Sequence, residues 1–177
     1  MTRPRVLVAG VGNIFLGDDA FGVEVVRALA RRPLPAGVRV ADFGIRGLDL
    51  AYALLDGYEA VVLVDAAPRG GRPGTLYVLE VGPPEPGDAE PTVAGHNLDP
   101  ARGLRLAAAM AGPARRLLVV GCEPGPPGDV EEMAAGLSEP VRAAVGEAVA
   151  VLESLVGELL GAGGGPAGQG EGGSCRS

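Results

Sequence analysis

Short runs of β-branched and aliphatic residues alternate along this chain with segments of helical periodicity, and this alternation limits the possible folds most strongly. The clearest run is Ala60–Asp65 (AVVLVD), whose unbroken apolar character is typical of a parallel strand covered on both faces. Similar runs occur at Arg5–Gly10, Val38–Phe43 and Arg116–Cys122. Strands separated by helices in this way predict a three-layer α/β/α domain.

The helical segments and one exceptional strand complete this prediction. We expect helices at four places along the chain: Ala20–Arg32, Leu48–Leu55, Leu98–Met110 and Pro140–Leu160. The run Thr75–Val81 alternates apolar with polar residues and carries Glu80, which is typical of an edge strand. Only the turn Pro68–Gly74 precedes it, which is too short for a crossover helix, so this strand should run antiparallel to its neighbours.

The length of the chain suits one domain with one core. Of the 177 residues, we assign 1–160 to that domain and expect the glycine-rich segment 161–177 to be disordered. No run of about 18 apolar residues is present, so no membrane-spanning helix is expected. The first residues lack the apolar core of a signal peptide, and Cys122 and Cys175 are a poor disulfide pair. These features predict a cytoplasmic protein.

The charge of the chain argues against two classes of partner. Acidic residues outnumber basic ones by 22 to 15, the formal net charge is −7, and every basic residue is arginine. A surface of this charge repels phosphate groups. We therefore expect no binding to nucleic acid and no attachment to an anionic membrane.

The first predicted strand leads into a glycine-rich loop, Gly10–Asp19 (GVGNIFLGDD). Phe15 stands where a dinucleotide-binding loop needs its third glycine, and no lysine follows as in a phosphate-binding loop. Asp18 and Asp19 would also repel a phosphate at the start of the next helix, so a cation fits better. For one of the two aspartates, capping this helix is the expected role, but a cap needs only one side chain.

Two further candidates come from the ends of later elements. Asp65 closes the most apolar strand, where an aspartate can also form a simple Asx turn. His96 is the only histidine, and a single loop histidine is more often a solvated or capping residue. However, Asp19, Asp65 and His96 all lie at junctions after predicted strands, and in a doubly wound sheet the loops that follow the strands lie at one edge. Two carboxylates and an imidazole can bind Ni²⁺ or Zn²⁺, and water activated by the metal or by a carboxylate can attack a carbonyl.

A nucleophilic side chain is the competing chemistry. The chain contains no G-x-S-x-G sequence, so a serine hydrolase of that type is excluded. Cys122 ends a predicted strand and could form a thiol triad with His96 and an aspartate. The apolar run before Cys122 favours a buried, small hydrophobic role instead, because such surroundings raise the pKa of a thiol.

Taken in order and spacing, these residues resemble the nickel–iron hydrogenase maturation proteases. The resemblance extends from the first predicted strand to the last predicted helix. The segments that carry it are Gly10-Val11-Gly12-Asn13, Asp18-Asp19, Gly22-Val23, Val64-Asp65-Ala66, Pro73-Gly74-Thr75, Gly95-His96, Gly121-Cys122-Glu123-Pro124 and Gly136-Leu137-Ser138.

The resemblance implies a fold and an activity. The implied fold is a phosphorylase/hydrolase-like α/β/α sandwich whose five-stranded mixed sheet has the order 2-1-3-5-4, with strand 4 antiparallel. The implied activity is that of an aspartyl endopeptidase, which removes the C-terminal extension of a hydrogenase large-subunit precursor after nickel insertion. The nickel is then supplied by the substrate, and no permanent organic cofactor is expected.

The same resemblance implies roles for particular residues. Asp19, Asp65 and His96 match the residues that recognise nickel, and the two aspartates are the candidates for catalysis. Asn13, Asp18 and Glu123 are candidates for the loops that contact the substrate. Which aspartate acts as the base, and whether nickel itself polarises the carbonyl, stays open at this stage.

Two other functions fit parts of the sequence. A non-catalytic nickel-binding or chaperone module of the same pathway would use the same three ligands. A phosphorylase-like or nucleotide-binding domain would need cationic contacts to phosphate in the first loop, which Asp18, Asp19 and the absence of lysine argue against. A purely structural protein would leave the acidic residues and the single histidine at one sheet edge unexplained.

Overall fold

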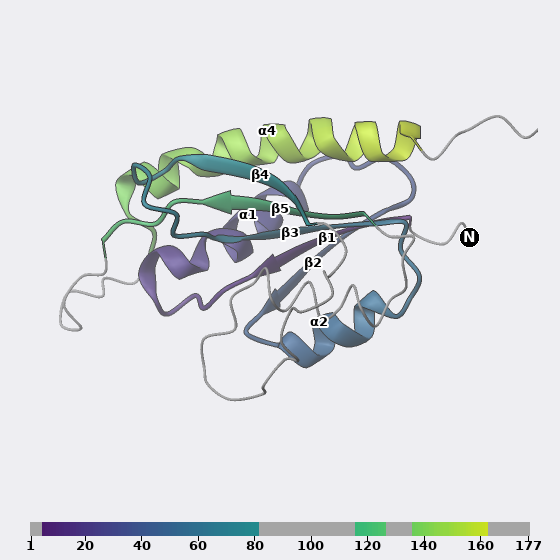
Figure 1. Ribbon diagram of the computed structural model, residues 1–177, viewed down its shortest axis with the longest axis horizontal. Coiled ribbons are helices and arrows are strands. Elements are labelled where there is room, and N and C mark those ends of the chain that lie inside the picture. Colours follow the sequence, from purple (N-terminus) through teal and green to yellow (C-terminus); the bar gives the residue numbers. More distant parts are fainter. Residues whose placement is uncertain (1–4, 82–115, 127–135, 163–177) are drawn as a thin grey trace, which may run out of the picture.

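Figure 1 shows the computed structural model of the protein, which describes residues 5–81, 116–126 and 136–162. The predicted helix Leu98–Met110, the candidate ligand His96 and residues 163–177 lie outside the described residues. The helices and strands are β1 (Val6–Val11), the short 3-10 helix η1 (Gly17–Ala20), α1 (Phe21–Leu29), β2 (Val38–Gly44), α2 (Gly47–Leu54), β3 (Ala60–Ala66), β4 (Leu76–Val81), β5 (Arg116–Cys122) and α4 (Glu139–Ala162).

The strands form one five-stranded sheet in the order β2-β1-β3-β5-β4. β1 pairs in parallel with β2 and β3, β3 pairs in parallel with β5, and β4 lies antiparallel to β5 at the edge. This confirms the predicted fold class, including the strand order and the antiparallel edge strand. The carboxyl ends of the four parallel strands therefore meet at one edge of the sheet.

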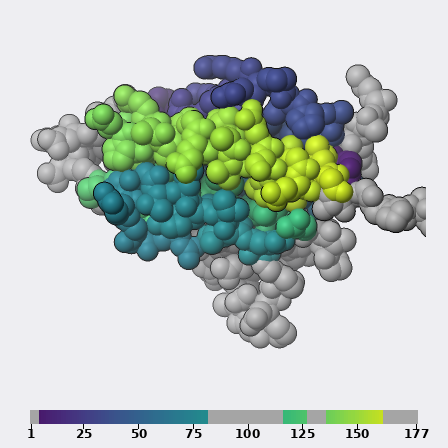
Figure 2. Space-filling view, turned by 90° about the horizontal axis from the view of Figure 1, so that it is seen from above, coloured from purple at the N-terminus to yellow at the C-terminus, as the bar shows by residue number. Residues whose placement is uncertain are grey.

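Helices cover both faces of the sheet (Figure 1). Val62 and Val64 of β3 pack in the core beneath α1 and α4, whereas Val61 and Leu63 belong to the core on the side of α2. In the view of Figure 2, α4 extends across the molecule beside β4. Because both faces of β3 are buried, its unbroken apolar sequence has the expected structural reason.

The ends of the described α-helices differ from the predicted ones by one to three residues. α1 begins at Phe21, after the 3-10 helix η1, and ends at Leu29 rather than Arg32. It ends early because Pro33 follows closely, and a residue before proline is disfavoured in the helical region. α4 continues through Gly161 and Ala162, two residues past the predicted end of the domain.

In the part of the chain that the structure describes, no helix has the length and apolar character needed to cross a membrane.

Candidate active site

The first turn of α1 packs directly on the ends of two central strands. A Cβ atom at Gly22 would lie 2.0 Å from the carbonyl oxygen of Val64 and 2.4 Å from that of Val11. Only glycine allows this close approach of a helix to strands β1 and β3. As a result, Asp19, three residues before Gly22, lies at the carboxyl ends of both strands.

A second glycine brings Asp19 and Asp65 to the same place. Gly12 has a φ of +128°, and a Cβ on it would lie 1.8 Å from the carbonyl oxygen of Asp19 and 3.7 Å from Oδ1 of Asp65. The adjacent Asn13 donates its backbone N–H to Oδ2 of Asp19 at 2.7 Å. The two aspartates, 46 positions apart in the sequence, thus flank the Gly12–Asn13 backbone.

Asp65 is buried at the end of β3, with only 5% of its surface exposed. Its Oδ1 accepts a hydrogen bond from the backbone N–H of the next residue, Ala66, at 2.8 Å. An Asx turn would instead use the N–H two residues on. A carboxylate buried in this way is costly unless hydrogen bonds or a cation compensate for lost hydration, which is a property of functional sites.

Asp18 has a different environment from its neighbour Asp19. Its Oδ1 accepts the backbone N–H of Ser138 at 2.6 Å, and its Oδ2 accepts the Ser138 hydroxyl and the backbone N–H of Gly125, both at 2.8 Å. Asp18 therefore joins the first loop to the segment after β5 and to the start of α4. Ser138 and Gly125 were not assigned this role from the sequence; the available signal was a serine directly before a helix, where capping residues are common.

The sequence predicts that one of the two aspartates caps the following helix, and this prediction is wrong. No side chain caps η1 or α1, whose N-cap residues are Leu16 and Ala20. Asp18 and Asp19 both lie inside η1 and accept hydrogen bonds from other segments. The extra 3-10 turn shifts the start of α1 beyond them.

Asn13 shapes the loop that carries the aspartates. Its Oδ1 accepts the backbone N–H of Phe15 at 2.9 Å, which folds the loop back on itself. The next three side chains, Ile14, Phe15 and Leu16, are exposed, and Phe15 has 77% of its surface accessible. An apolar loop tip therefore lies beside Asp19.

Glu123 is buried just after β5 and holds the loop between β3 and β4. Its carboxylate accepts the backbone N–H groups of Arg69 at 2.8 Å and Gly70 at 3.1 Å, and the hydroxyl of Tyr77 at 2.8 Å. Burial raises the pKa of Glu123, but the hydrogen bonds from Arg69, Tyr77 and the glycines outweigh it, so its pKa lies below the usual value. The same contact with Glu123, together with burial, raises the pKa of Tyr77.

Cys122 belongs to the core rather than to the site. Its side chain is fully buried in the core beneath α1 and α4. Burial, followed by the negative charge of Asp18, raises the pKa of the Cys122 thiol to about 11. A thiol with this pKa is protonated near neutral pH and is a poor nucleophile, as expected for a small buried hydrophobic residue.

Two of the three predicted nickel ligands lie beside the same backbone segment, Gly12–Asn13. The Asp65 carboxylate lies beside Gly12 and the Asp19 carboxylate accepts the N–H of the next residue, Asn13, whereas His96 lies outside the described residues. Within residues 5–81, 116–126 and 136–162, no group of three His, Cys, Asp or Glu side chains could hold a metal ion. The third ligand therefore stays a prediction from the sequence.

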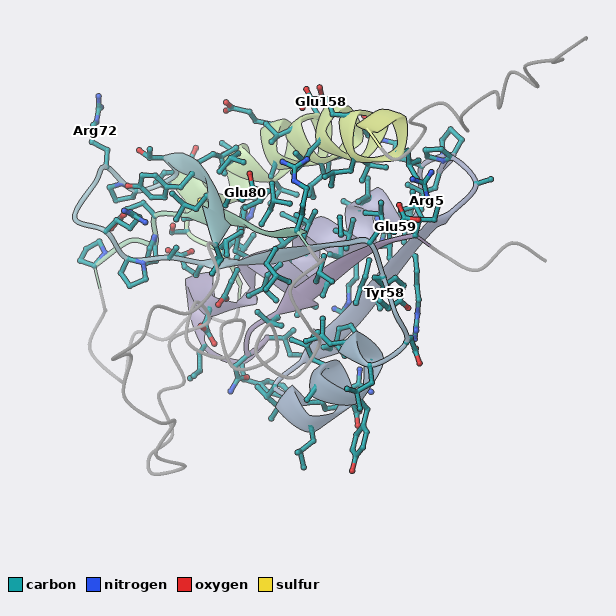
Figure 3. The ribbon with its side chains drawn as sticks, turned by 45° about the vertical axis from the view of Figure 1, so that its right-hand side comes forward. Arg5, Tyr58, Glu59, Arg72, Glu80 and Glu158 are labelled. Atoms are coloured by element: carbon teal, nitrogen blue, oxygen red, sulfur yellow. The ribbon has the colours of Figure 1, made fainter. Side chains whose placement is uncertain are left out.

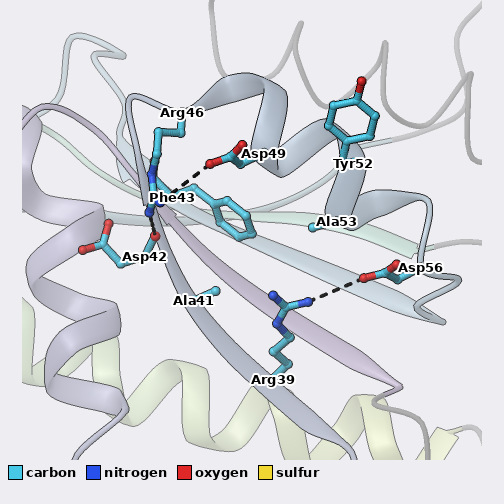
Figure 4. Close-up of a pocket in the computed structure, with 9 residues that line it drawn as sticks. All are labelled: Arg39, Ala41, Asp42, Phe43, Arg46, Asp49, Tyr52, Ala53 and Asp56. Carbon is cyan, nitrogen blue, oxygen red and sulfur yellow. Dashed lines mark hydrogen bonds and ion pairs between the residues drawn. The ribbon is translucent and has the colours of Figure 1, made fainter.

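A separate groove of about 390 Å³ lies between β2 and α2 (Figure 4). Its charged side chains pair with one another: Arg39 lies 3.5 Å from Asp56, and Arg46 lies 3.6 Å from Asp49. Because these charges neutralise each other, the groove offers less to a charged ligand than the edge of the sheet does.

Comparison with known proteins decides the family. A family model described as hydrogenase maturation protease matches residues 23–155. The chain belongs to the hydrogenase maturation protease family. A hydrogenase expression/formation protein of Azotobacter vinelandii, HoxM, is 32% identical over 165 residues, which are 89% of this chain and 75% of the relative.

Solved structures of maturation proteases share the fold. The hydrogenase maturating endopeptidase HybD of Escherichia coli superposes with a TM-score of 0.67 at 27% identity, covering 87% of this chain and 93% of HybD. The [NiFe] hydrogenase maturation protease HycI of Thermococcus kodakarensis gives a TM-score of 0.59 at 26% identity, over 90% and 94% of the two chains. This hydrogenase maturation protease is accordingly a peptidase.

Proposed function

We propose that this maturation protease is an endopeptidase that removes the C-terminal extension of a nickel–iron hydrogenase large-subunit precursor after nickel insertion. The similar structures named a hydrogenase maturating endopeptidase and a [NiFe] hydrogenase maturation protease support this activity. The observation that carries the proposal is that Asp19 and Asp65 flank the Gly12–Asn13 backbone at the carboxyl edge of the sheet. Ligands of doubly wound folds bind at this edge.

Asp19, Asp65 and His96 would recognise nickel that is already bound to the precursor. Carboxylate oxygens and an imidazole nitrogen are suitable ligands for Ni²⁺. Their contribution completes the coordination of an ion that the substrate carries, so the ion belongs to the substrate and no organic cofactor is required. A precursor without nickel would lack the group that these residues recognise.

Recognition of the ion would also position the peptide bond that is cleaved. Holding the peptide at a fixed place beside Asp19 and Asp65 lowers the entropic part of the barrier. A water molecule activated by one of the carboxylates, or by the nickel ion, would then attack the peptide carbonyl. Asp19 is partly exposed to water, whereas Asp65 is buried.

The test compares nickel-loaded with nickel-free precursor, using the wild type and the variants Asp19→Asn, Asp65→Asn, His96→Ala and Cys122→Ala. Mass spectrometry should show loss of the C-terminal extension only from the nickel-loaded precursor. We expect the first three variants to lose processing by a factor on the order of 100 or more, and Cys122→Ala to retain it. Full activity of His96→Ala would refute nickel recognition, and an inactive but folded Cys122→Ala protein would favour thiol chemistry.

A non-catalytic nickel chaperone would use the same three residues. The names of the relatives, which are proteases and endopeptidases, favour the catalytic function. The same assay distinguishes the two, because a chaperone would bind the nickel-loaded precursor without shortening it.

A further inference from the structure

Two arginines beside the candidate site lack the ion pairs that most other described arginines of this acidic protein form. Six of the other described arginines form ion pairs with acidic side chains: Arg5–Glu59, Arg27–Asp42, Arg32–Glu153, Arg39–Asp56, Arg46–Asp49 and Arg116–Glu80. Arg142 donates to the carbonyl of Leu137, and Arg31, at the opposite end of α1 from the site, forms no ion pair within these residues. Arg69 and Arg72 are exposed, and neither forms an ion pair with any residue that the structure describes. Both lie on the loop between β3 and β4.

This loop is held in place from inside the protein. The buried carboxylate of Glu123 accepts the N–H groups of Arg69 and Gly70, and the Glu123 carbonyl accepts the N–H of Gly74 at 2.8 Å. The Arg69 guanidinium lies over the ring of Tyr77, 5.5 Å from its centre. A cationic side chain that is already ordered loses less entropy when it binds an anion.

The loop also lies close to the candidate site. It begins at Ala67, two residues after Asp65. Arg69 follows Asp65 by four residues, so their Cα atoms are at most about 14 Å apart. In Figure 3, the side chain of Arg72 points away from the body of the molecule. A peptide that is cleaved beside Asp65 would therefore reach this loop within about four or five residues.

We propose that Arg69 and Arg72 bind a carboxylate of the precursor's C-terminal segment, and so help to select the substrate. The proposal rests on the proposed function. Guanidinium groups bind carboxylates through paired, charge-assisted hydrogen bonds. Although the chain has a net charge of −7, two exposed cations without ion-pair partners in the described residues favour an anionic group at this position.

The test measures processing of nickel-loaded precursor by the wild type, Arg69→Ala, Arg72→Ala and the double variant. Arg31→Ala is the matched control, because Arg31 is exposed, lies beyond the far end of α1 and forms no ion pair within the described residues. We expect the double variant to raise KM roughly tenfold at unchanged kcat. Wild-type KM should rise with salt, and the double variant should show a weaker dependence. If the double variant had the same KM and the same salt dependence as the wild type, the proposal would be overturned.

Two further measurements separate this role from a structural one. Arg69→Lys keeps the charge but not the paired hydrogen bonds, so it should recover part of the affinity that Arg69→Ala loses. The melting temperatures of all variants should stay close to that of the wild type. Failure of Arg69→Lys to recover affinity, with a lowered melting temperature, would assign Arg69 a structural role and overturn the proposal.

The source of the carboxylate is tested with fluorescent peptides that correspond to the C-terminal segment of the precursor. One peptide carries a C-terminal amide, and another has Asn or Gln in place of its acidic side chains. Fluorescence anisotropy measures the binding of each peptide to the wild type. One of the two altered peptides should bind as weakly as the unmodified peptide binds to the double variant. If both altered peptides bind as tightly as the unmodified one, the proposal is overturned. This binding assay needs no cleavage. If the wild type failed to process the precursor, the proposed function would be refuted, and the peptide-binding result would still decide the inference about Arg69 and Arg72.

Discussion

At the scale of single residues, two adjacent aspartates have different environments. Asp19 accepts one backbone hydrogen bond, from Asn13, beside the buried Asp65, whereas Asp18 accepts three hydrogen bonds from Ser138 and Gly125. The contacts of Asp18 connect three segments that are distant in the sequence. We infer that Asp18 positions the first loop, and that Asp19 is the aspartate that meets the substrate.

Replacing Asp18 should therefore lower the free energy of unfolding more than removing the hydroxyl of Ser138 does. In Asp18→Asn, the new amide group must face a hydrogen-bond donor, so we expect a loss of about 1–3 kcal/mol in the free energy of unfolding. Ser138→Ala removes one hydrogen bond to Asp18 and should cost about 1 kcal/mol. Urea unfolding measures both, with the exposed Asp49→Asn as control; equal stability of Asp18→Asn and wild type would contradict this role.

At the scale of elements, the contact between α1 and the sheet sets the position of the site. α1 contacts β1 and β3 through Gly22, whose backbone lies against the carbonyl groups of Val11 and Val64. A larger residue at position 22 would move the helix away from both strands. Asp19 would move with it.

Gly22→Ala should therefore destabilise the protein and impair the site together. We expect a loss of about 1–3 kcal/mol, because the added methyl group has no space and the helix must shift. Gly157→Ala in α4 is the matched control, since nothing lies within 4 Å of a Cβ at that position. That variant should gain up to about 1 kcal/mol, because alanine favours a helix more than glycine does. Urea unfolding and the processing assay check both variants, and equal effects of the two substitutions would contradict the packing explanation.

At the scale of the whole molecule, a buried acid links folding to pH. The pKa of Glu123 is lowered in the folded protein because backbone N–H groups and the Tyr77 hydroxyl stabilise its ionised form more than burial disfavours it. The ionised form therefore stabilises the fold above the pKa of the unfolded chain. This contribution disappears as the pH falls through the lower folded value.

Glu123→Gln should accordingly reduce stability near neutral pH and change its pH dependence. Urea unfolding of the variant at several pH values should show a shallower loss of stability on acidification than the wild type shows, with the two curves converging below about pH 4. Glu153→Gln, an exposed position in α4, should leave the wild-type curve almost unchanged. Parallel curves for Glu123→Gln and wild type would show that Glu123 does not provide this linkage.

The sequence by itself determined the fold class, the antiparallel edge strand and the buried character of Cys122. These follow from local patterns, since an apolar run such as Ala60–Asp65 and a turn as short as Pro68–Gly74 allow few arrangements. The same patterns placed Asp65 at the end of one strand and Asp19 in the segment that follows another, at the edge of the sheet where ligands of such folds bind.

Only the tertiary structure decided how the residues at that edge divide their roles. Helix capping, predicted for one of the aspartates, is absent because η1 precedes α1 and other segments supply the hydrogen-bond donors. The partners of Asp18 and Glu123 come from residues that are more than 40 positions away. Hydrogen bonds over such separations depend on how the elements pack, which no local sequence pattern encodes.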